Sequence, residues 1–222
     1  MGDRKTVLLF DVDNTLLDND HVIADLMRHI TGRFGQEPQR RYAAIIEELR
    51  DSLGYVDYLG ALQQYRREFP HQPHMLAISK YLVDYPFANR LFPASLDVLQ
   101  KAGRHGLVVI LTDGDVVFQP RKLERSGIAE AVDGRILLYI HKELELADVE
   151  RHYPADHYVL FDDKLRIRNE VKKTWGARVT TVFVRQGHYA NDVAAVAKLK
   201  PADVAVKRIV DLLDYDFSTL VG

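Results

Sequence analysis

The chain has 222 residues, of which 47% are hydrophobic and 28% are charged, the balance of an ordinary globular protein with one core and room for a small added module. Its formal net charge of -2 gives no global field that would recruit nucleic acid or an anionic membrane, although a small anionic substrate needs only local positive charge. The sequence contains no cysteine, which excludes disulfides, thiol catalysis and thiolate metal sites.

The first apolar run, residues 7–10, predicts a short buried strand and is too short for the core of a signal peptide. No apolar stretch approaches the roughly 20 residues that a membrane-spanning helix needs. We therefore expect a cytoplasmic protein that binds neither membrane nor nucleic acid. The sequence leaves its oligomeric state open.

Residues 19–89 contain no convincing strand. Four segments with helical apolar spacing, separated by glycine and proline, fill this stretch: 21–32, 39–53, 55–68 and 73–82. We interpret it as a helical module inserted after the first strand. The predicted domains are an α/β core of residues 1–18 and 90–222 and a helical cap of residues 19–89.

Strands and helices alternate after this insert. Further strands are predicted at 107–111, 158–161 and 179–184, with a weaker candidate at 136–139, and helices at 94–103, 120–126 and 165–175. Residues 204–213 are expected to form a last short strand or helix at the sheet edge. This alternation predicts an α/β fold with a doubly wound, mostly parallel, Rossmann-like sheet and helices on both faces.

Two carboxylates follow the first predicted strand directly, in the segment Asp11-Val-Asp13-Asn-Thr15. Ligands of open parallel sheets bind beyond the carboxyl ends of the strands, so Asp11 and Asp13 stand where chemistry is expected. Two converging carboxylates repel each other unless a cation compensates. Mg²⁺, a hard ion that takes oxygen ligands, is the cation that we expect.

Other predicted strands end in complementary groups. Thr112, Asp113 and Gly114 follow one strand and offer a hydroxyl and backbone amides that suit phosphate oxygens. Asp162 and Asp163 follow another strand as a second carboxylate pair, and Lys142 follows the weak strand. Carboxylates, a hydroxyl and a cation together are the inventory of a metal-assisted phosphoryl-transfer site.

In these motifs the sequence resembles the haloacid dehalogenase-like superfamily of hydrolases. Asp11 to Thr15 match its first motif, Leu111-Thr112 its second, Lys142 its third and Asp162-Asp163 its fourth, in the family's order and approximate spacing. The resemblance covers nearly the whole chain, and residues 19–89 resemble the family's cap placed after the first motif.

The resemblance implies a role for each motif residue. Asp11 would be the nucleophile that forms an aspartyl-phosphate, and Asp13 the acid that protonates the leaving oxygen and then the base that activates water. Thr112 and the amides of Asp113 and Gly114 would hold phosphoryl oxygens, and Lys142 would balance their charge. The ligands implied for Mg²⁺ are the Asp11 carboxylate, the Asp13 carbonyl, and Asp163 with Asp162 either direct or through water.

The sequence departs from the family pattern at three places. Asp113 stands where the second motif usually has a neutral amide, and Glu143 follows Lys142 where proline is common. Lys164 competes with Lys142 for the charge-balancing role. The further acid often found after the fourth motif is replaced by Ile167 and Arg168.

These features predict a magnesium-dependent phosphatase that acts on a small phosphorylated metabolite. Two rivals belong to the same superfamily: a dehalogenase, which would need neither Asp13 nor a metal, and a phosphomutase, which the motifs do not separate from a hydrolase. A third hypothesis, from another class of protein, is a non-catalytic binding module. The unusual Asp113 and Glu143 are the residues that support this alternative.

Overall fold

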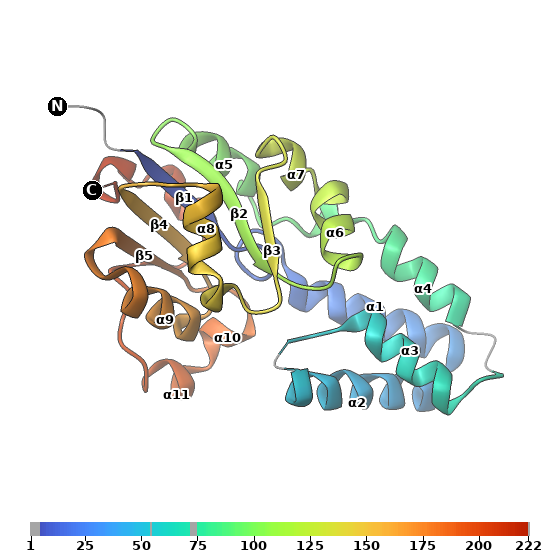
Figure 1. The fold of residues 1–222 in the computed structure, drawn as a ribbon. Coiled ribbons are helices and arrows are strands. Elements are labelled where there is room, and N and C mark those ends of the chain that lie inside the picture. The colour runs from blue at the N-terminus through green and yellow to red at the C-terminus, as the bar shows by residue number, and fades with distance from the viewer. Residues whose placement is uncertain (1–4, 54, 72–74, 222) are drawn as a thin grey trace.

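The computed structural model describes residues 5–53, 55–71 and 75–221. Figure 1 shows an α/β core on one side and a group of four helices, α1 to α4, on the other. The core is built on a six-stranded sheet of order β3-β2-β1-β4-β5-β6, in which all neighbouring strands are parallel. The strands are β1 (Thr6–Phe10), β2 (Leu107–Asp113), β3 (Ile136–Tyr139), β4 (His157–Asp162), β5 (Val179–Val184) and β6 (Val204–Val206).

Helices cover both faces of this sheet, because successive strand residues point to opposite sides and both sides are apolar. From β1, Val7 and Leu9 pack in one buried cluster with α8 (Leu146–His152) and α9 (Leu165–Trp175). Leu8 and Phe10 point the other way, into the larger cluster that includes residues of three further helices. These are α5 (Ser95–Ala102), α6 (Phe118–Ser126) and α7 (Ile128–Ala131).

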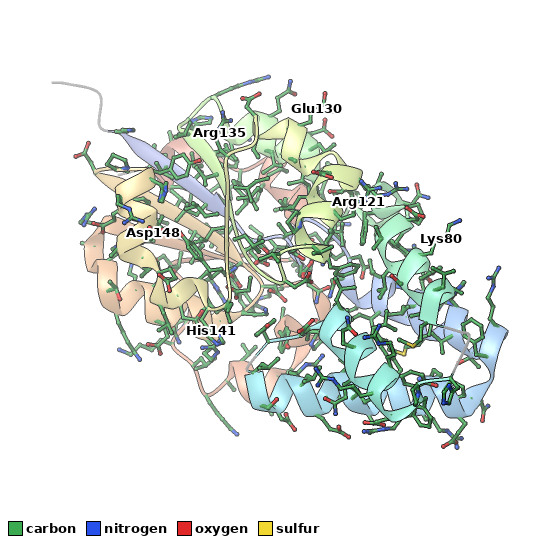
Figure 2. The ribbon with its side chains drawn as sticks, turned by 45° about the vertical axis from the view of Figure 1, so that its right-hand side comes forward. Lys80, Arg121, Glu130, Arg135, His141 and Asp148 are labelled. Atoms are coloured by element: carbon green, nitrogen blue, oxygen red, sulfur yellow. The ribbon has the colours of Figure 1, made fainter. Side chains whose placement is uncertain are left out.

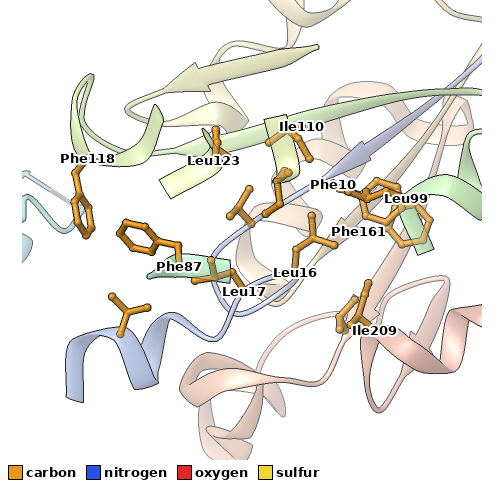
Figure 3. Packing of buried hydrophobic residues seen from close by; sticks show 14 of the residues in the cluster. Phe10, Leu16, Leu17, Phe87, Leu99, Ile110, Phe118, Leu123, Phe161 and Ile209 are labelled. Carbon is orange, nitrogen blue, oxygen red and sulfur yellow. The ribbon is translucent and has the colours of Figure 1, made fainter. Parts of the chain in front are cut away.

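The helical insert is made of α1 (Asn19–Phe34), α2 (Gln36–Leu53), α3 (Tyr58–Glu68) and α4 (Met75–Asp84). Its apolar interior continues into the larger core cluster through α6. The ring of Phe118 on α6 lies 5.2 Å from that of Tyr58 and 5.5 Å from that of Phe87. Figure 3 shows Phe87 and Phe118 side by side at this junction. The division of the chain into a core and a cap domain stays a prediction.

The expected fold class is confirmed, and each predicted strand and helix of the core is present. The segment 204–213 divides into β6 and the short 3-10 helix Ile209–Leu213. The start of the predicted helix 73–82, and Gly54, lie outside the described residues. Helix α8 was missed, as were the short helices α10 (Gly187–Asn191) and α11 (Val193–Val196). Within the described residues, no helix combines the length and apolarity that crossing a membrane requires.

Candidate active site

The carboxyl end of β1 lies between the ends of β2 and β4, and this neighbourhood assembles the site. The backbone pairing continues one residue beyond β1, where the Asp11 amide donates to the Phe161 carbonyl at 2.9 Å. Asp11 therefore lies beside Asp162 at the end of β4. On the other flank, β2 brings Thr112 and Asp113 to the same edge of the sheet.

Asp11 and Lys142 form a buried ion pair at the centre of this edge. The Lys142 ammonium lies 2.5 Å from Oδ1 of Asp11 and 2.7 Å from Oδ2 of Asp162. The hydroxyl of Thr15 donates to the other oxygen of Asp11 at 3.1 Å. Burial raises the pKa of Asp11 to about 6 against the opposing effect of Lys142. Burial also disfavours the charge of Lys142, but Asp11, Asp162 and Asp113 together hold its pKa well above the usual value.

Three carboxylates form a compact, buried cluster that could hold a metal ion. One oxygen each from Asp11, Asp162 and Asp163 lie within 4.8 Å of one another. Asp162 is already engaged, since its Oδ1 accepts from the Lys164 amide at 2.6 Å and its Oδ2 faces Lys142. Neither oxygen of Asp163 has a hydrogen-bond partner among the described residues. Buried carboxylate oxygens without partners are costly, so this donor set fits a hard divalent cation such as Mg²⁺.

Two further cations lie close to the carboxylate cluster. Burial opposes the charge of Lys164, but Asp163 and Asp11 outweigh it and raise the pKa of Lys164. Its ammonium lies 5.2 Å from the ring centre of Tyr189 and forms no ion pair with a carboxylate of the described residues. Burial lowers the pKa of Arg168 to about 10, opposed by Asp162 and Asp163, and its guanidinium stacks 4.0 Å from the ring centre of Phe183. A buried arginine thus stands near the pair where the family often has an acid.

Asp13 lies apart from the carboxylate cluster and faces the cavity, with 27% of its side chain exposed. Its Oδ1 accepts a hydrogen bond of 2.5 Å from Lys122, a fully buried lysine of α6. The same ammonium donates to Oδ1 of Asn19 at 3.0 Å. Asn19 is the first residue of α1, so this contact joins the loop after β1, the start of the insert and α6.

Thr112 is held by a glutamine of α6. Nε2 of the buried Gln119 donates to Oγ1 of Thr112 at 2.9 Å. Gly114 allows this approach, because it has φ +156° and a Cβ there would lie 2.8 Å from Cβ of Gln119. The Gly114 amide, which we expected to face a phosphate, instead donates to the Tyr139 carbonyl at 3.0 Å, since the β2–β3 pairing extends past the end of β2.

The two unusual acids both brace the loop that carries Lys142. Oδ1 of Asp113 accepts from the Lys142 amide at 2.7 Å, which ties the end of β2 to the loop after β3. Burial raises the pKa of Asp113, against the opposing effect of Lys142. Glu143 receives a hydrogen bond of 2.7 Å from Arg166 of α9.

A left-handed residue shapes the loop after Asp13. Asn14 has φ +63°, a conformation that asparagine tolerates better than most residues. Its side chain exchanges hydrogen bonds with Asp20 at the start of α1, and Asp20 in turn accepts from His188 of α10. Gly187 passes so close that an added Cβ would lie 2.4 Å from Cβ of Asn14. These contacts link the loop to both the insert and the end of the sheet.

The site opens into a cavity of about 100 Å³ that core and insert line together. Asp13, Asp113 and Lys164 form part of its wall on the core side, and Arg50, Tyr55 and Tyr58 contribute from the insert and the segment between α2 and α3. The ring centre of Tyr55 lies 6.4 Å from that of His141. Figure 2 shows His141 on the loop after β3, where the core meets the insert.

The structure places the eight predicted site residues at one edge of the sheet, with Asp13 apart from the carboxylate cluster, and it adds several that the sequence analysis missed. The buried additions are Lys122, Gln119 and Asn19, none of which follows a predicted strand, and Asn14, which lies within the first motif but was given no role. Lys122 and Gln119 carry a readable signal, because two polar residues three apart on one face of a helix are unusual on a side that packs against the core. Their partners could not be read from the sequence.

Comparisons with known proteins agree with this arrangement. The family model described as haloacid dehalogenase-like hydrolase matches residues 5–150. A haloacid dehalogenase-like hydrolase from Burkholderia xenovorans is 57% identical, with a TM-score of 0.92 over 96% of this chain and 99% of that one. Among curated proteins, no significant match was found.

More distant structures share the fold alone. A magnesium-bound HAD hydrolase from Bacillus subtilis is 15% identical and has a TM-score of 0.62, covering 96% of this chain and 98% of that one. An L-2-haloacid dehalogenase from Xanthobacter autotrophicus, with chloropropionic acid covalently bound, is 16% identical with a TM-score of 0.61, covering 94% and 96%. With a family model that matches most of its length, this chain belongs to the haloacid dehalogenase-like hydrolases.

Proposed function

We propose that this hydrolase is a magnesium-dependent phosphatase of a small phosphorylated metabolite. The observation that carries the proposal is the combination of two features of the site. Asp13 stands outside the carboxylate cluster with its side chain on the cavity, and neither oxygen of Asp163 has a hydrogen-bond partner in the part of the chain that the structure describes. A proton donor and a cation site are what phosphate ester cleavage requires and what attack on a carbon–halogen bond does not.

In the first step, the Asp11 carboxylate attacks phosphorus and the bond from phosphorus to the ester oxygen breaks. Asp13 gives its proton to that oxygen, which leaves as an alcohol, and an aspartyl-phosphate remains on Asp11. In the second step, water attacks the phosphorus of this intermediate while Asp13 takes the water proton. Inorganic phosphate leaves and the Asp11 carboxylate is restored.

The surrounding residues orient and neutralise the phosphoryl group. The Thr112 hydroxyl accepts from Gln119 and donates a long hydrogen bond of 3.4 Å to the Asp113 carbonyl, which it would exchange for a phosphoryl oxygen. Lys142, which is buried, and Lys164, which is half-buried, supply two positive charges beside it. Asp11, Asp163 and the Asp13 carbonyl would hold Mg²⁺, which would supply further charge compensation. Asp162, the third member of the carboxylate cluster, would bind the ion directly or through water.

The cavity supports the size of the substrate in this proposal. Its volume of about 100 Å³ suits the leaving group of a small ester, and its lining combines tyrosines with cationic side chains. Since Tyr58 and Arg50 come from the insert, the insert contributes to selecting the leaving group, as a cap that closes over the site would.

The proposal is tested with p-nitrophenyl phosphate and a panel of phosphorylated metabolites, assayed in Mg²⁺ and in EDTA. We expect phosphate release that depends on Mg²⁺ and that Asp11→Asn abolishes. Chloride release from 2-chloropropionate in EDTA, without phosphatase activity, would establish the dehalogenase alternative instead. A phosphomutase would yield an isomeric phosphate ester without free phosphate, and a binding module would yield neither product.

A further inference from the structure

Lys122 is a buried cation that the mechanism above leaves without a role. It lies in the middle of α6 with 0% of its surface exposed, and its ammonium is 5.2 Å from the ring centre of Phe118. The ammonium donates to Asp13 at 2.5 Å and to Asn19 at 3.0 Å. A buried ammonium requires a compensating charge, and Asp13 supplies it.

This pair is poorly explained as a device for stability. Taking an ammonium out of water costs several kcal/mol, which the attraction to a carboxylate roughly offsets, so apolar residues often serve a fold equally well. Asp13 is more than a quarter exposed and could be solvated without Lys122. The contact instead fixes the orientation of the Asp13 carboxylate, because one of its oxygens is held by a donor that is itself buried and immobile.

We propose that Lys122 is a positioning residue for Asp13. By holding Oδ1, Lys122 leaves Oδ2 as the oxygen that exchanges the proton with the leaving group. The Lys122 ammonium also donates to Asn19, the first residue of α1. The orientation of Asp13 therefore depends on where the helical insert begins. This inference rests on the proposed phosphatase function and extends it to a residue outside the four motifs.

The test compares two esters in Lys122→Met, a variant of similar volume without the charge. A misplaced general acid slows the hydrolysis of esters whose leaving group needs a proton. General acid catalysis typically contributes 10²–10⁴-fold to the rate. We expect kcat/KM for an unactivated alkyl phosphate from the substrate panel to fall about 30-fold or more. With p-nitrophenyl phosphate, whose leaving group departs as a stable anion, the fall should stay below about 3-fold. A general structural defect would lower both values alike.

A double-mutant cycle with Asp13→Asn isolates the coupling. If Lys122 acts through Asp13, Lys122→Met causes no further loss of alkyl phosphatase activity when Asp13 is already replaced. Lys101→Met is the matched control, because the Lys101 ammonium donates to three main-chain carbonyls near the C-terminus and does not line the cavity. The control should leave the ratio of the two esters unchanged.

Asn19→Ala gives a second, independent variant should Lys122→Met fold poorly. It removes the other acceptor of the ammonium and should shift the ester ratio in the same direction, by about 3-fold to 10-fold. Equal losses for both esters in folded variants, or additive losses in the cycle, would overturn the role of Lys122 while leaving the phosphatase intact. Failure of the wild-type protein to hydrolyse any phosphate ester in Mg²⁺ would overturn both proposals.

Discussion

The Lys142 ammonium lies 2.5 Å from Oδ1 of Asp11, with both side chains almost completely removed from solvent. This contact bears on the competition between Lys142 and Lys164, because Lys164 forms no ion pair with any carboxylate of the described residues. Lys164 instead places its ammonium above the ring of Tyr189. The geometry favours Lys142 as the partner of the proposed nucleophile and leaves Lys164 at the cavity wall.

Lys142→Met should therefore be much more harmful than Lys164→Met. Loss of a preorganised charge at the reacting group costs about 10²–10³-fold in kcat, and breaking a buried ion pair costs about 3–5 kcal/mol in stability. For Lys164→Met we expect about a 10-fold loss, mainly in KM, because this residue lines the cavity without contacting Asp11 directly. Steady-state kinetics and thermal unfolding of both variants check this, and equal kinetic losses would contradict the assignment.

The raised pKa of Asp11 predicts that the ionised form of this carboxylate lowers the free energy of unfolding of the metal-free protein. A folded-state pKa of about 6 means that the folded chain holds the proton more tightly than the unfolded chain. The stabilisation from this proton is complete below about pH 4, the usual range of aspartate, and is lost as the pH rises through 6. Above that pH, the ionised Asp11 costs on the order of 1–3 kcal/mol.

Asp11→Asn should thus be more stable than the wild type at pH 8 in EDTA, while being inactive, because the Lys142 ammonium keeps Asp162 at 2.7 Å as its counter-charge. The difference should shrink as the pH falls from 6 to 4. Urea unfolding at several pH values measures it, and Asp51→Asn, at an exposed position of α2, controls for the loss of one negative charge. A stability difference between Asp11→Asn and the wild type that does not change with pH would contradict the raised pKa of Asp11.

The sheet and the motif residues could be predicted because their signals are local. Short apolar runs rich in β-branched residues gave the strands, and the parallel alternation determined that Asp11, Thr112 and Asp162 would meet at one edge. Helix α8 was not predicted because Leu146–His152 contains four charged or histidine side chains in seven residues and buries only Leu146 and Val149. Such a short segment has too little periodicity to predict a helix.

The contacts that refine the site could not be predicted, because they join residues far apart in the sequence. Lys122 meets Asp13 across 109 positions, and Lys142 meets Asp11 across 131. At Gly114 the local signal was misleading. A glycine directly after a strand indicated a backbone amide available for phosphate, but this amide donates to the Tyr139 carbonyl in the β2–β3 pairing. Which backbone groups remain available depends on the neighbouring strand, whose register no motif specifies.

The two carboxylate oxygens of Asp163, which have no hydrogen-bond partner among residues 5–53, 55–71 and 75–221, predict a specific response to metal. If Mg²⁺ binds the folded protein and not the unfolded chain, a concentration of 100 times the dissociation constant stabilises the fold by about 2.7 kcal/mol. Thermal unfolding in MgCl₂ against EDTA should show this rise in Tm for the wild type. Asp163→Asn should lose most of it, whereas the control Asp148→Asn, outside the carboxylate cluster, should retain it. A full Tm rise in Asp163→Asn would place the metal elsewhere.

Asp113 predicts a contrast between two substitutions at one position. Its Oδ1 accepts from the Lys142 amide at 2.7 Å, and an asparagine oxygen could accept the same bond. Asp113→Asn should therefore keep Lys142 in place while removing a carboxylate from the wall of a cavity that receives an anion. We expect kcat/KM for phosphate esters to be unchanged or to rise by up to about 10-fold, mainly through a lower KM.

Asp113→Ala removes the acceptor altogether and leaves the Lys142 amide without its side-chain partner. The loop that carries Lys142 then loses its tie to β2, and a hydrogen bond to a charged group is worth about 1.5–3 kcal/mol. Activity should fall by at least about 10-fold, with the loss appearing in kcat because Lys142 acts on the reacting group. If alanine and asparagine gave the same kinetics, Asp113 would act through its charge alone, and its bond to Lys142 would have no part in catalysis.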